Sequence, residues 1–370
     1  DADQARKEVL KICRDKNCKT VVKSKSMVTE EIKINDFLHE NNIESFETDL
    51  GEYIQQLDGE TPYHIVTPAM HKSKEDVAKV FYEKLDTPPN LSPKELTLIA
   101  RENLRKKYVE AEVGITGANF IVSDIGRVAL TENEGNGRLS AALPKTHIVI
   151  VGIEKVLSSL SDLALFWPLL STFGTGQRVT VYNTIFCGPR QPGEADGPDE
   201  MYVILLDNGR TNLLANTRLR ESMYCIRCGA CLNACPIYKN IGGHAYGTTY
   251  SGPIGSVITP HLKGMKEWKH LSYASSLCGN CTEVCPVRIN IHELLLENRN
   301  EAVGAGDAAL AEKMAWKIWK RASLSRRMMN AGNSRLKNRM FNKLYKGWTA
   351  HHAGLAFAEK TFNQQWKEKK

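Results

Sequence analysis

Seven of the ten cysteines stand in two short runs whose spacing is suited to metal clusters. The first run is Cys225-x2-Cys228-x2-Cys231-x3-Cys235, the second is Cys278-x2-Cys281-x3-Cys285, and a proline follows each. Three thiolates at x2 spacing fit on one tight loop that wraps a cubane, whereas the fourth ligates the other cluster of a pair. The spacing therefore predicts two 4Fe-4S clusters with crossed ligands. We expect cluster one to take Cys225, Cys228, Cys231 and Cys285, and cluster two to take Cys235, Cys278 and Cys281.

The second run is one thiolate short. The position three residues before Cys278 holds Ser275. The fourth iron of cluster two would therefore take another ligand, and several candidates are open: Ser275 itself, Cys13, Cys18, Cys187, His270, a water or a group from a partner. Cys187, at the end of a predicted strand, is the best placed of the remaining thiols. Cys13 and Cys18 are expected to be ordinary thiols.

Zinc and disulfides are the alternatives for so many cysteines. Structural zinc takes four ligands in a closed tetrahedron, usually as pairs, and seven cysteines with two Cys-Pro endings fit that poorly. Disulfides belong to oxidising compartments, and the chain shows no secretory signal. The cysteines therefore favour iron–sulfur chemistry in a reducing compartment, and we expect a cytoplasmic protein.

Length and charge bound the remaining possibilities. The 370 residues, 42% hydrophobic and 25% charged, predict two or more globular domains. No stretch approaches the roughly 20 apolar residues of a membrane span. From Val287 onward the chain carries 17 Lys and Arg against seven Asp and Glu. This basic tail suits an acidic partner or anionic lipid at the inner face of a membrane, or is a solvated helical face. We expect no nucleic acid, because aromatic platforms do not interleave with the basic residues.

Residues 1–215 alternate between strand and helix patterns, which predicts an α/β domain with a largely parallel sheet. His147 to Val151 is a continuous apolar run, as expected of a strand buried on both faces. Ser92-Pro93-Lys94-Glu95 combines the cap, the proline and the glutamate of a helix start. Further strands are predicted at 20–23, 63–66, 179–184 and 201–206, a hairpin at 119–131 and a helix at 74–85.

From residue 216 the pattern changes to cysteine loops, short helices and glycines. Residues 216–300 are predicted to form an α-helical, two-cluster ferredoxin-like domain, with a helix beginning near Asn290. The 42 residues between the two cysteine runs include Gly242-Gly243-His244-Ala245-Tyr246-Gly247 and are expected to add turns over the clusters. Residues 301–370 are predicted to be a basic amphipathic helical tail, with apolar residues at helical spacing in two stretches: Leu310, Met314 and Ile318, then Leu336, Met340 and Leu344.

Two polar segments with glycines follow predicted strands and form a candidate ligand pocket. In open α/β sheets, ligands bind outside the carboxyl ends of strands. Arg138 and Arg210 would grip a carboxylate or phosphate, with Asn133, Glu134 and Asn208 orienting it. The alternative is that both segments are tight turns. Gly174-Thr175-Gly176 lacks the rest of a dinucleotide fingerprint. The scattered histidines are expected to be packed or exposed rather than ligands: His64, His71, His147 and His244.

Several motifs resemble the lactate utilization protein B family, the iron–sulfur subunit of a bacterial L-lactate oxidation system. They include Lys23-Ser24-Lys25-Ser26-Met27, Glu47-Thr48-Asp49-Leu50-Gly51-Glu52-Tyr53-Ile54, Gly114-Ile115-Thr116-Gly117-Ala118-Asn119-Phe120, Asn133-Glu134-Gly135-Asn136-Gly137-Arg138, Gly152-Ile153-Glu154-Lys155, Leu206-Asp207-Asn208-Gly209-Arg210 and both cysteine runs with Ser275. The resemblance runs from Lys23 to nearly the C-terminus. Family members usually have more residues ahead of these motifs, so we expect a shortened N-terminus.

The resemblance implies a first domain like the sheets of sugar-phosphate isomerases and CoA transferases. It also implies a second module like the two-cluster subunits of heterodisulfide reductase and succinate dehydrogenase. Two companion subunits and the oxidation of L-lactate to pyruvate are implied as well. The leading hypothesis is an electron-transfer subunit that passes electrons between donor and acceptor proteins through two 4Fe-4S clusters. The alternative is an oxidoreductase subunit in which the incompletely thiolate-ligated second cluster is catalytic.

Overall fold

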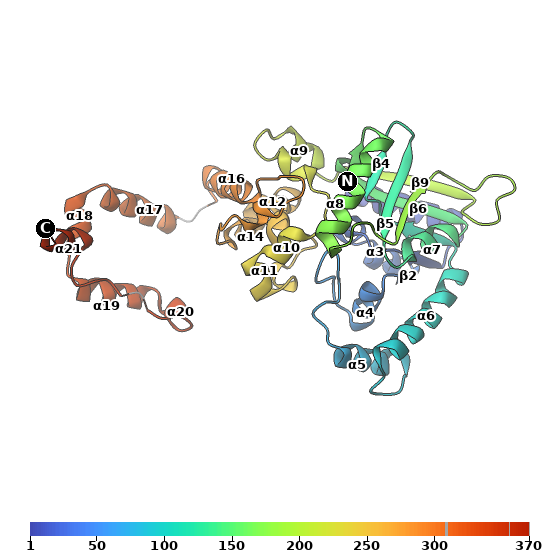
Figure 1. Cartoon of the computed structure of the whole chain (residues 1–370), viewed down its shortest axis with the longest axis horizontal. Coiled ribbons are helices and arrows are strands. Elements are labelled where there is room, and N and C mark those ends of the chain that lie inside the picture. Colours follow the sequence, from blue (N-terminus) through green and yellow to red (C-terminus); the bar gives the residue numbers. More distant parts are fainter. Residues whose placement is uncertain (308–309, 355, 370) are drawn as a thin grey trace. The chain divides into compact units, whose positions relative to one another are not determined.

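Short β-rich runs in the first 206 residues pair into a five-stranded parallel sheet (Figure 1). The strand order is β2-β1-β3-β6-β9, and every neighbouring pair is parallel. β6 is buried at every residue, as its apolar run predicts. The predicted α/β region with a parallel sheet is confirmed. The strands are β1 (Thr20–Lys23), β2 (Glu44–Glu47), β3 (Val113–Thr116), β6 (Thr146–Gly152) and β9 (Glu200–Leu206).

Helices cover both faces of this sheet, because successive strand residues point to opposite sides. Val21 packs with α1 and α3, whereas its neighbour Val22 packs with α4, α5 and α6. The predicted helix start at Ser92 has a complete capping box with Glu95. The helices are α1 (Ala2–Asp15), α2 (Met27–Glu31), α3 (Ile34–Glu40), α4 (Leu50–Asp58), α5 (Lys74–Leu85), α6 (Pro93–Glu110) and α7 (Asn136–Ala142).

A second, four-stranded sheet packs beside β6, in the order β7-β4-β5-β8. Its β4–β5 pair is the predicted hairpin. Val128 of β5 contacts Val149 and Val151 of β6, and the other face packs on α8 (Leu163–Thr175). Sequence patterns had suggested one sheet only. The strands are β4 (Phe120–Val122), β5 (Arg127–Glu132), β7 (Val156–Leu157) and β8 (Tyr182–Phe186), and the short helices nearby are η1 (Ile153–Lys155) and η2 (Leu160–Asp162).

The strand predicted at residues 63–66 is wrong. This segment is an irregular loop in which the backbone N–H of Tyr63 donates to the Pro68 carbonyl at 3.0 Å. The N–H of Val66 donates to Nδ1 of His64 at 3.1 Å. Such local bonds satisfy the backbone without a neighbouring strand. The strand predicted at 179–184 begins and ends later, at Tyr182 and Phe186.

The cysteine-bearing region is helical and has its own hydrophobic core, which includes Leu219, Tyr250 and Val257. It belongs to the same compact unit as the sheets, Asp1–Ala302. Its elements are α9 (Arg210–Ala215), η3 (Arg220–Tyr224), α10 (Ala230–Ala234), α11 (Pro236–Ile241), η4 (His244–Tyr246), α12 (Gly252–Lys263), α13 (Met265–Trp268), α14 (His270–Tyr273), α15 (Asn280–Glu283) and α16 (Ile291–Gly304).

The second compact unit, Val303–Lys370, consists of short helices. The computed structural model describes residues 1–307, 310–354 and 356–369. Within these ranges, no helix is long and apolar enough to cross a bilayer. The helices of the second unit are α17 (Leu310–Ser323), α18 (Arg326–Asn330), α19 (Ser334–Leu344), α20 (Lys346–Thr349) and α21 (Phe362–Glu368).

Candidate functional site

The two cysteine loops repeat the same backbone turn. Arg227 and Leu277, each directly before a cysteine, have φ angles of 64° and 54°, and Gly229 and Gly279, directly after it, have φ angles of 82° and 85°. A short helix then follows each loop, α10 after the first and α15 after the second. Left-handed conformations at non-glycine residues are uncommon and are kept where the surroundings require them. The shared turn therefore indicates that the two cysteine loops have the same function.

Backbone N–H groups point at several cysteine sulfurs. The N–H of Arg227 donates to Sγ of Cys225 at 3.4 Å, and the N–H of Ile289 donates to Sγ of Cys285 at 3.3 Å. The N–H of Tyr238 donates likewise to Sγ of Cys235. Hydrogen bonds of this kind favour the thiolate form that binds metal and tune the potential of a cluster.

Most thiol neighbours fall into two groups, but one contact crosses between them, because Cys231 has Cys281 as a thiol neighbour as well as Cys225 and Cys228. Burial raises the pKa of Cys228 to about 11, with smaller contributions from the nearby thiols of Cys225 and Cys285. Burial raises the pKa of Cys281 to about 11 as well, with Cys235 and Cys278 as its thiol neighbours. Apart from the contact between Cys231 and Cys281, these neighbour relations follow the crossed grouping that the spacing predicts, but they do not assign ligands to a cluster. The assignment stays a prediction.

The described cysteines form no preformed zinc site in the structure. A tetrahedral zinc with Zn–S bonds of about 2.3 Å holds its sulfurs about 3.8 Å apart. Among the described residues, no three cysteines have all their sulfurs within 4.8 Å of one another. Thiols on two repeated loops, with N–H groups directed at them, suit a larger cluster. The donor set therefore fits an iron–sulfur group.

Ser275 stands in the second loop where Cys225 stands in the first. The backbone N–H of Leu277 donates to Oγ of Ser275 at 3.1 Å, as the N–H of Arg227 does to the sulfur of Cys225. The serine thus keeps the local geometry of a first ligand and presents oxygen instead of sulfur. The other candidates differ in setting. Cys13 and Cys18 are buried in the core beside the parallel sheet. Cys187, directly after β8, is exposed and lines a separate surface pocket. Nδ1 of His270 forms a hydrogen bond with the Glu267 carbonyl.

A cavity of about 360 Å³ lies beside the first cysteine loop. One wall comes from the carboxyl ends of three neighbouring parallel strands, because residues 24–28 follow β1, residues 117–119 follow β3 and residues 154–155 follow β6. The opposite wall includes Ile226, Arg227 and Cys228 of the cysteine loop, together with Tyr250. The cavity therefore joins the usual ligand position of an α/β sheet to a predicted ligand of cluster one.

Two cations stand in the cavity wall beside the cysteines: Lys155, which follows β6, and Arg227, which belongs to the cysteine loop. Nζ of Lys155 donates to the carbonyl of Cys225 at 2.6 Å. Burial, and then the nearby charge of Arg227, lower the pKa of Lys155 to about 8. The guanidinium of Arg227 lies over the Tyr250 ring, and its Nη2 is 3.9 Å from Oε1 of Glu154. No sequence pattern singled out these two residues as site residues, although Lys155 closely follows a predicted buried strand, which was a usable signal.

The pocket residues predicted from sequence divide into two groups. Asn133 and Glu134 line the cavity, whereas Arg138, Asn208 and Arg210 do not. Arg210 is buried, where its guanidinium bonds both carboxylate oxygens of Glu31 and, at 2.6 Å, Oε2 of Glu154. Nδ2 of Asn208 also donates to Glu31, and Arg138 lies over the Tyr182 ring. These three side chains hold neighbouring segments together.

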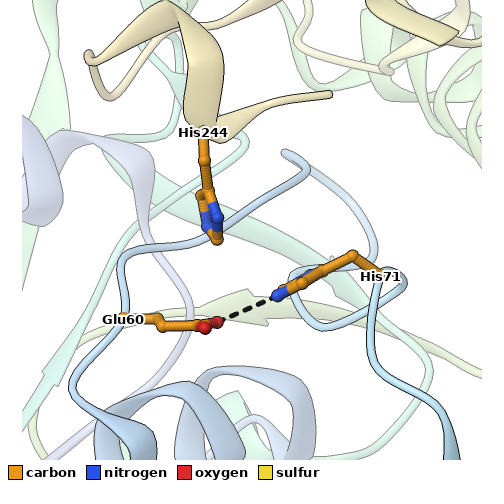
Figure 2. A group of neighbouring side chains, drawn as sticks. All are labelled: Glu60, His71 and His244. Carbon is orange, nitrogen blue, oxygen red and sulfur yellow. Dashed lines mark hydrogen bonds and ion pairs between the residues drawn. The ribbon is translucent and has the colours of Figure 1, made fainter. Parts of the chain in front are cut away.

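Two of the scattered histidines meet at the surface. Figure 2 shows Glu60 and His71 joined by a hydrogen bond, with His244 of the insert beside them. Their ligand atoms lie within 4.8 Å of one another, a spacing that a metal ion could use. The ammonium of Lys72, however, is already 3.1 Å from the Glu60 carboxylate, and Nε2 of His244 bonds the Thr61 carbonyl at 2.8 Å. The group therefore fastens the insert to the 60–72 loop.

Comparisons with known proteins agree with this architecture. The profile of the LUD domain matches residues 1–206, and that of the 4Fe-4S dicluster domain matches residues 221–289. The protein named lactate utilization protein B of Bacillus velezensis is 49% identical over 334 residues, which cover 90% of this chain and 70% of that protein. Its namesake from Bacillus subtilis is 48% identical over 320 residues, which cover 86% and 67%. The chain belongs to the lactate utilization protein B family.

The family assignment confirms the resemblance read from the motifs. It also confirms iron–sulfur binding as the general character of the cysteine region. A solved structure of a DUF162 family protein from Deinococcus radiodurans covers 42% of this chain and 93% of its own, with a TM-score of 0.22 and 16% identity. That likeness is too distant to refine the fold of the LUD domain.

Proposed function

We propose that the protein is the electron-transfer iron–sulfur subunit of an L-lactate-oxidising system and works with companion subunits. The observation that carries this proposal is the pair of repeated cysteine loops, with N–H groups directed at their sulfurs. The names of its relatives supply the metabolic setting. When bound, iron–sulfur clusters supply one-electron transfer without a change in protein structure.

We further propose crossed ligation of two 4Fe-4S clusters, with Ser275 completing the second. Cluster one would take Cys225, Cys228, Cys231 and Cys285. Cluster two would take Cys235, Cys278, Cys281 and Oγ of Ser275. The thiol neighbourhoods and the N–H···Oγ bond of Ser275 support this arrangement.

The surroundings of the two groups of ligands differ, which suggests a direction for electron exchange. Lys155 contacts the first loop, and the guanidinium of Arg227, a residue of that loop, lies near the Cys225 thiol; positive charge nearby stabilises a reduced cluster. In the second loop Cys278 is exposed. Cluster two would therefore be the one that exchanges electrons with a partner protein at the surface.

The metal content tests the function directly. We expect the anaerobically purified chain to carry about eight irons with matching sulfide, as two cubanes require, and to show visible absorption that dithionite bleaches. Cys231→Ser should lose most of the iron of one cluster. Cys187→Ser is the matched control, since Cys187 lies outside both runs and is exposed, and it should keep the full iron content. Stoichiometric zinc in place of iron would overturn the proposal.

A second candidate function is catalysis at the second cluster. The exposure of Cys278 and the oxygen of Ser275 favour it, because an iron with an exchangeable ligand acts as a Lewis acid. Here L-lactate should change the spectrum of cluster two in the wild-type chain but not in Ser275→Cys. An unchanged spectrum in both chains would leave electron transfer as the function.

A further inference from the structure

We propose that the cavity of about 360 Å³ at the carboxyl ends of β1, β3 and β6 binds a small organic carboxylate. Its anionic group would lie between Ser24, Lys155 and Arg227, beside Cys228. The inference rests on the proposed function only in placing a cluster at Cys228, because the binding groups belong to the chain itself.

The first support is the topology. β1, β3 and β6 are consecutive neighbours in the parallel sheet, so the segments that follow them meet at one edge. Polar residues of these segments line the cavity: Ser24, Lys25 and Ser26 after β1, Asn119 after β3, and Glu154 and Lys155 after β6. Convergence of polar groups at this edge is how open α/β sheets form ligand sites.

The second support is a pair of unpartnered polar groups in the wall. Oγ of Ser24, in a residue that is 3% exposed, and Nη1 of Arg227 are buried and have no hydrogen-bond partner within the chain. Both residues line the cavity. A buried donor without a partner costs free energy and therefore calls for one. A hydroxyl and a guanidinium together suit a carboxylate, which accepts from both.

The third support is the local charge balance. Arg210, Arg227 and Lys155 form a buried group of cations, and the carboxylates against them are those of Glu31 and Glu154. One positive charge is left over, and cluster one or a bound anion can balance it. A bound carboxylate would offer an acceptor both to Nη1 of Arg227 and to Oγ of Ser24.

The acidic residues of the cavity wall already have partners within the chain, so they repel a bound anion only weakly. Asp49 pairs with Nζ of Lys25 at 3.1 Å. Glu132 accepts the backbone N–H groups of Gly137 and Arg138. Burial, and then the charge of Asp49, raise the pKa of Glu134.

The test uses the full chain with its clusters, handled anaerobically, and two probes, L-lactate and pyruvate. Calorimetry should show saturable binding of at least one acid. The reduction potential of cluster one should fall on binding, since added negative charge stabilises its oxidised form. Sulfate serves as the inorganic comparison and should bind more weakly than the organic acid.

Two serine variants locate the binding. Ser24→Ala removes an unpartnered hydroxyl from the wall, so the fold should be unaffected while affinity falls at least about tenfold, as for a hydrogen bond to a charged group. Ser222→Ala is the matched control, because Ser222 is also buried with an unpartnered hydroxyl but lies outside the cavity. Its affinity should stay at the wild-type value. Arg227→Gln should weaken binding further.

Four results would overturn the inference. They are a cluster-loaded chain that binds neither acid, equal binding of sulfate, equal weakening by the two serine variants, and an unchanged potential of cluster one at saturation. The first of these leaves the electron-transfer function intact. The reverse outcome is a purified chain that contains no iron but still binds the acid at Ser24. That result would overturn the proposed electron-transfer function and support carboxylate binding in the cavity.

Discussion

Oxygen in place of sulfur at Ser275 is the clearest residue-level departure from a symmetric pair of loops. The N–H of Leu277 already points at this side chain, so a cysteine there would meet the same donor that Cys225 meets in the first loop. We predict that Ser275→Cys gives a second cluster with four thiolates. Its Mössbauer spectrum should lose the component of a distinct, oxygen-ligated iron, and its potential should rise, because the harder oxygen ligand favours ferric iron.

A comparison of the wild-type chain with Ser275→Ala tests whether the serine is an iron ligand. Ser275→Ala removes the oxygen and leaves the turn, so the second cluster should lose iron more readily during gel filtration. The exposed Ser158 is the control position, and Ser158→Ala should not change iron retention. If wild-type and Ser275→Ala chains have identical Mössbauer spectra, the serine is not a ligand.

His147 predicts a pH dependence of stability. It is buried in β6, where Nε2 lies 2.8 Å from Oγ1 of Thr116, and burial lowers its pKa to about 4. The unfolded chain takes up this proton near pH 6.5, so the unfolding free energy should fall between about pH 6.5 and pH 4, by about 3 kcal/mol from this residue. Above pH 6.5 the contribution is constant.

Denaturant titrations across that pH range measure the effect. His147→Gln should reduce the slope of stability against pH, with the share from buried His64 remaining, whereas His39→Gln, at an exposed position on α3, should leave the slope unchanged. Equal slopes for the wild-type and His147→Gln chains would contradict the prediction.

At the scale of elements, Gly114 determines how closely α7 approaches the sheet. A Cβ atom at this position of β3 would lie 1.8 Å from the carbonyl oxygen of Ser140. Gly114→Ala should therefore displace α7 and lower the unfolding free energy by about 3 kcal/mol, as urea denaturation can measure. Gly304→Ala, at the end of α16 with open space around it, should change stability by less than about 1 kcal/mol. Similar effects of both substitutions would contradict this account.

Periodicity predicted those elements whose pattern depends on local contacts. The buried run of β6, the β4–β5 hairpin and the cap at Ser92 were all legible in the sequence. The loop at 63–66 was not, because its β-rich residues bond their own neighbours instead of a strand. The separate second sheet was missed because the pairing of β5 with β8 joins residues about 50 positions apart.

Only part of the candidate site, too, could be predicted from the sequence. Cysteine spacing pointed to the loops because all the ligands of a loop lie within a few residues. Arg210 looked like a ligand-binding residue, but three-dimensional packing pairs it with Glu31, which is 179 positions away. Lys155 and Arg227 meet only because the cysteine module packs against the end of β6. No local sequence pattern predicts the contact between Lys155 and Arg227.

At the scale of the whole molecule, the helices after residue 310 have no core of their own. None of the residues at 310–347, 349–354 and 356–369 is buried, and Leu310 and Leu344 are 80% and 74% exposed. Short helices that bury no apolar face are marginal in water. The apolar stripes predicted in this tail are therefore largely exposed, at 56–80% for their six residues. Partner contact and membrane contact both stay predictions for it.

This exposure predicts that the tail contributes little to the stability of the rest of the chain. A chain truncated after Gly306 should keep its iron content and its visible spectrum. Its thermal midpoint should stay within about 2–4 °C of the full chain, the shift that 1 kcal/mol produces in a domain of this kind. The matched control is the full chain with both Leu310→Gln and Leu344→Gln. It should likewise keep its iron content, its visible spectrum and its thermal midpoint. A large fall in midpoint or a loss of iron on truncation would contradict this prediction.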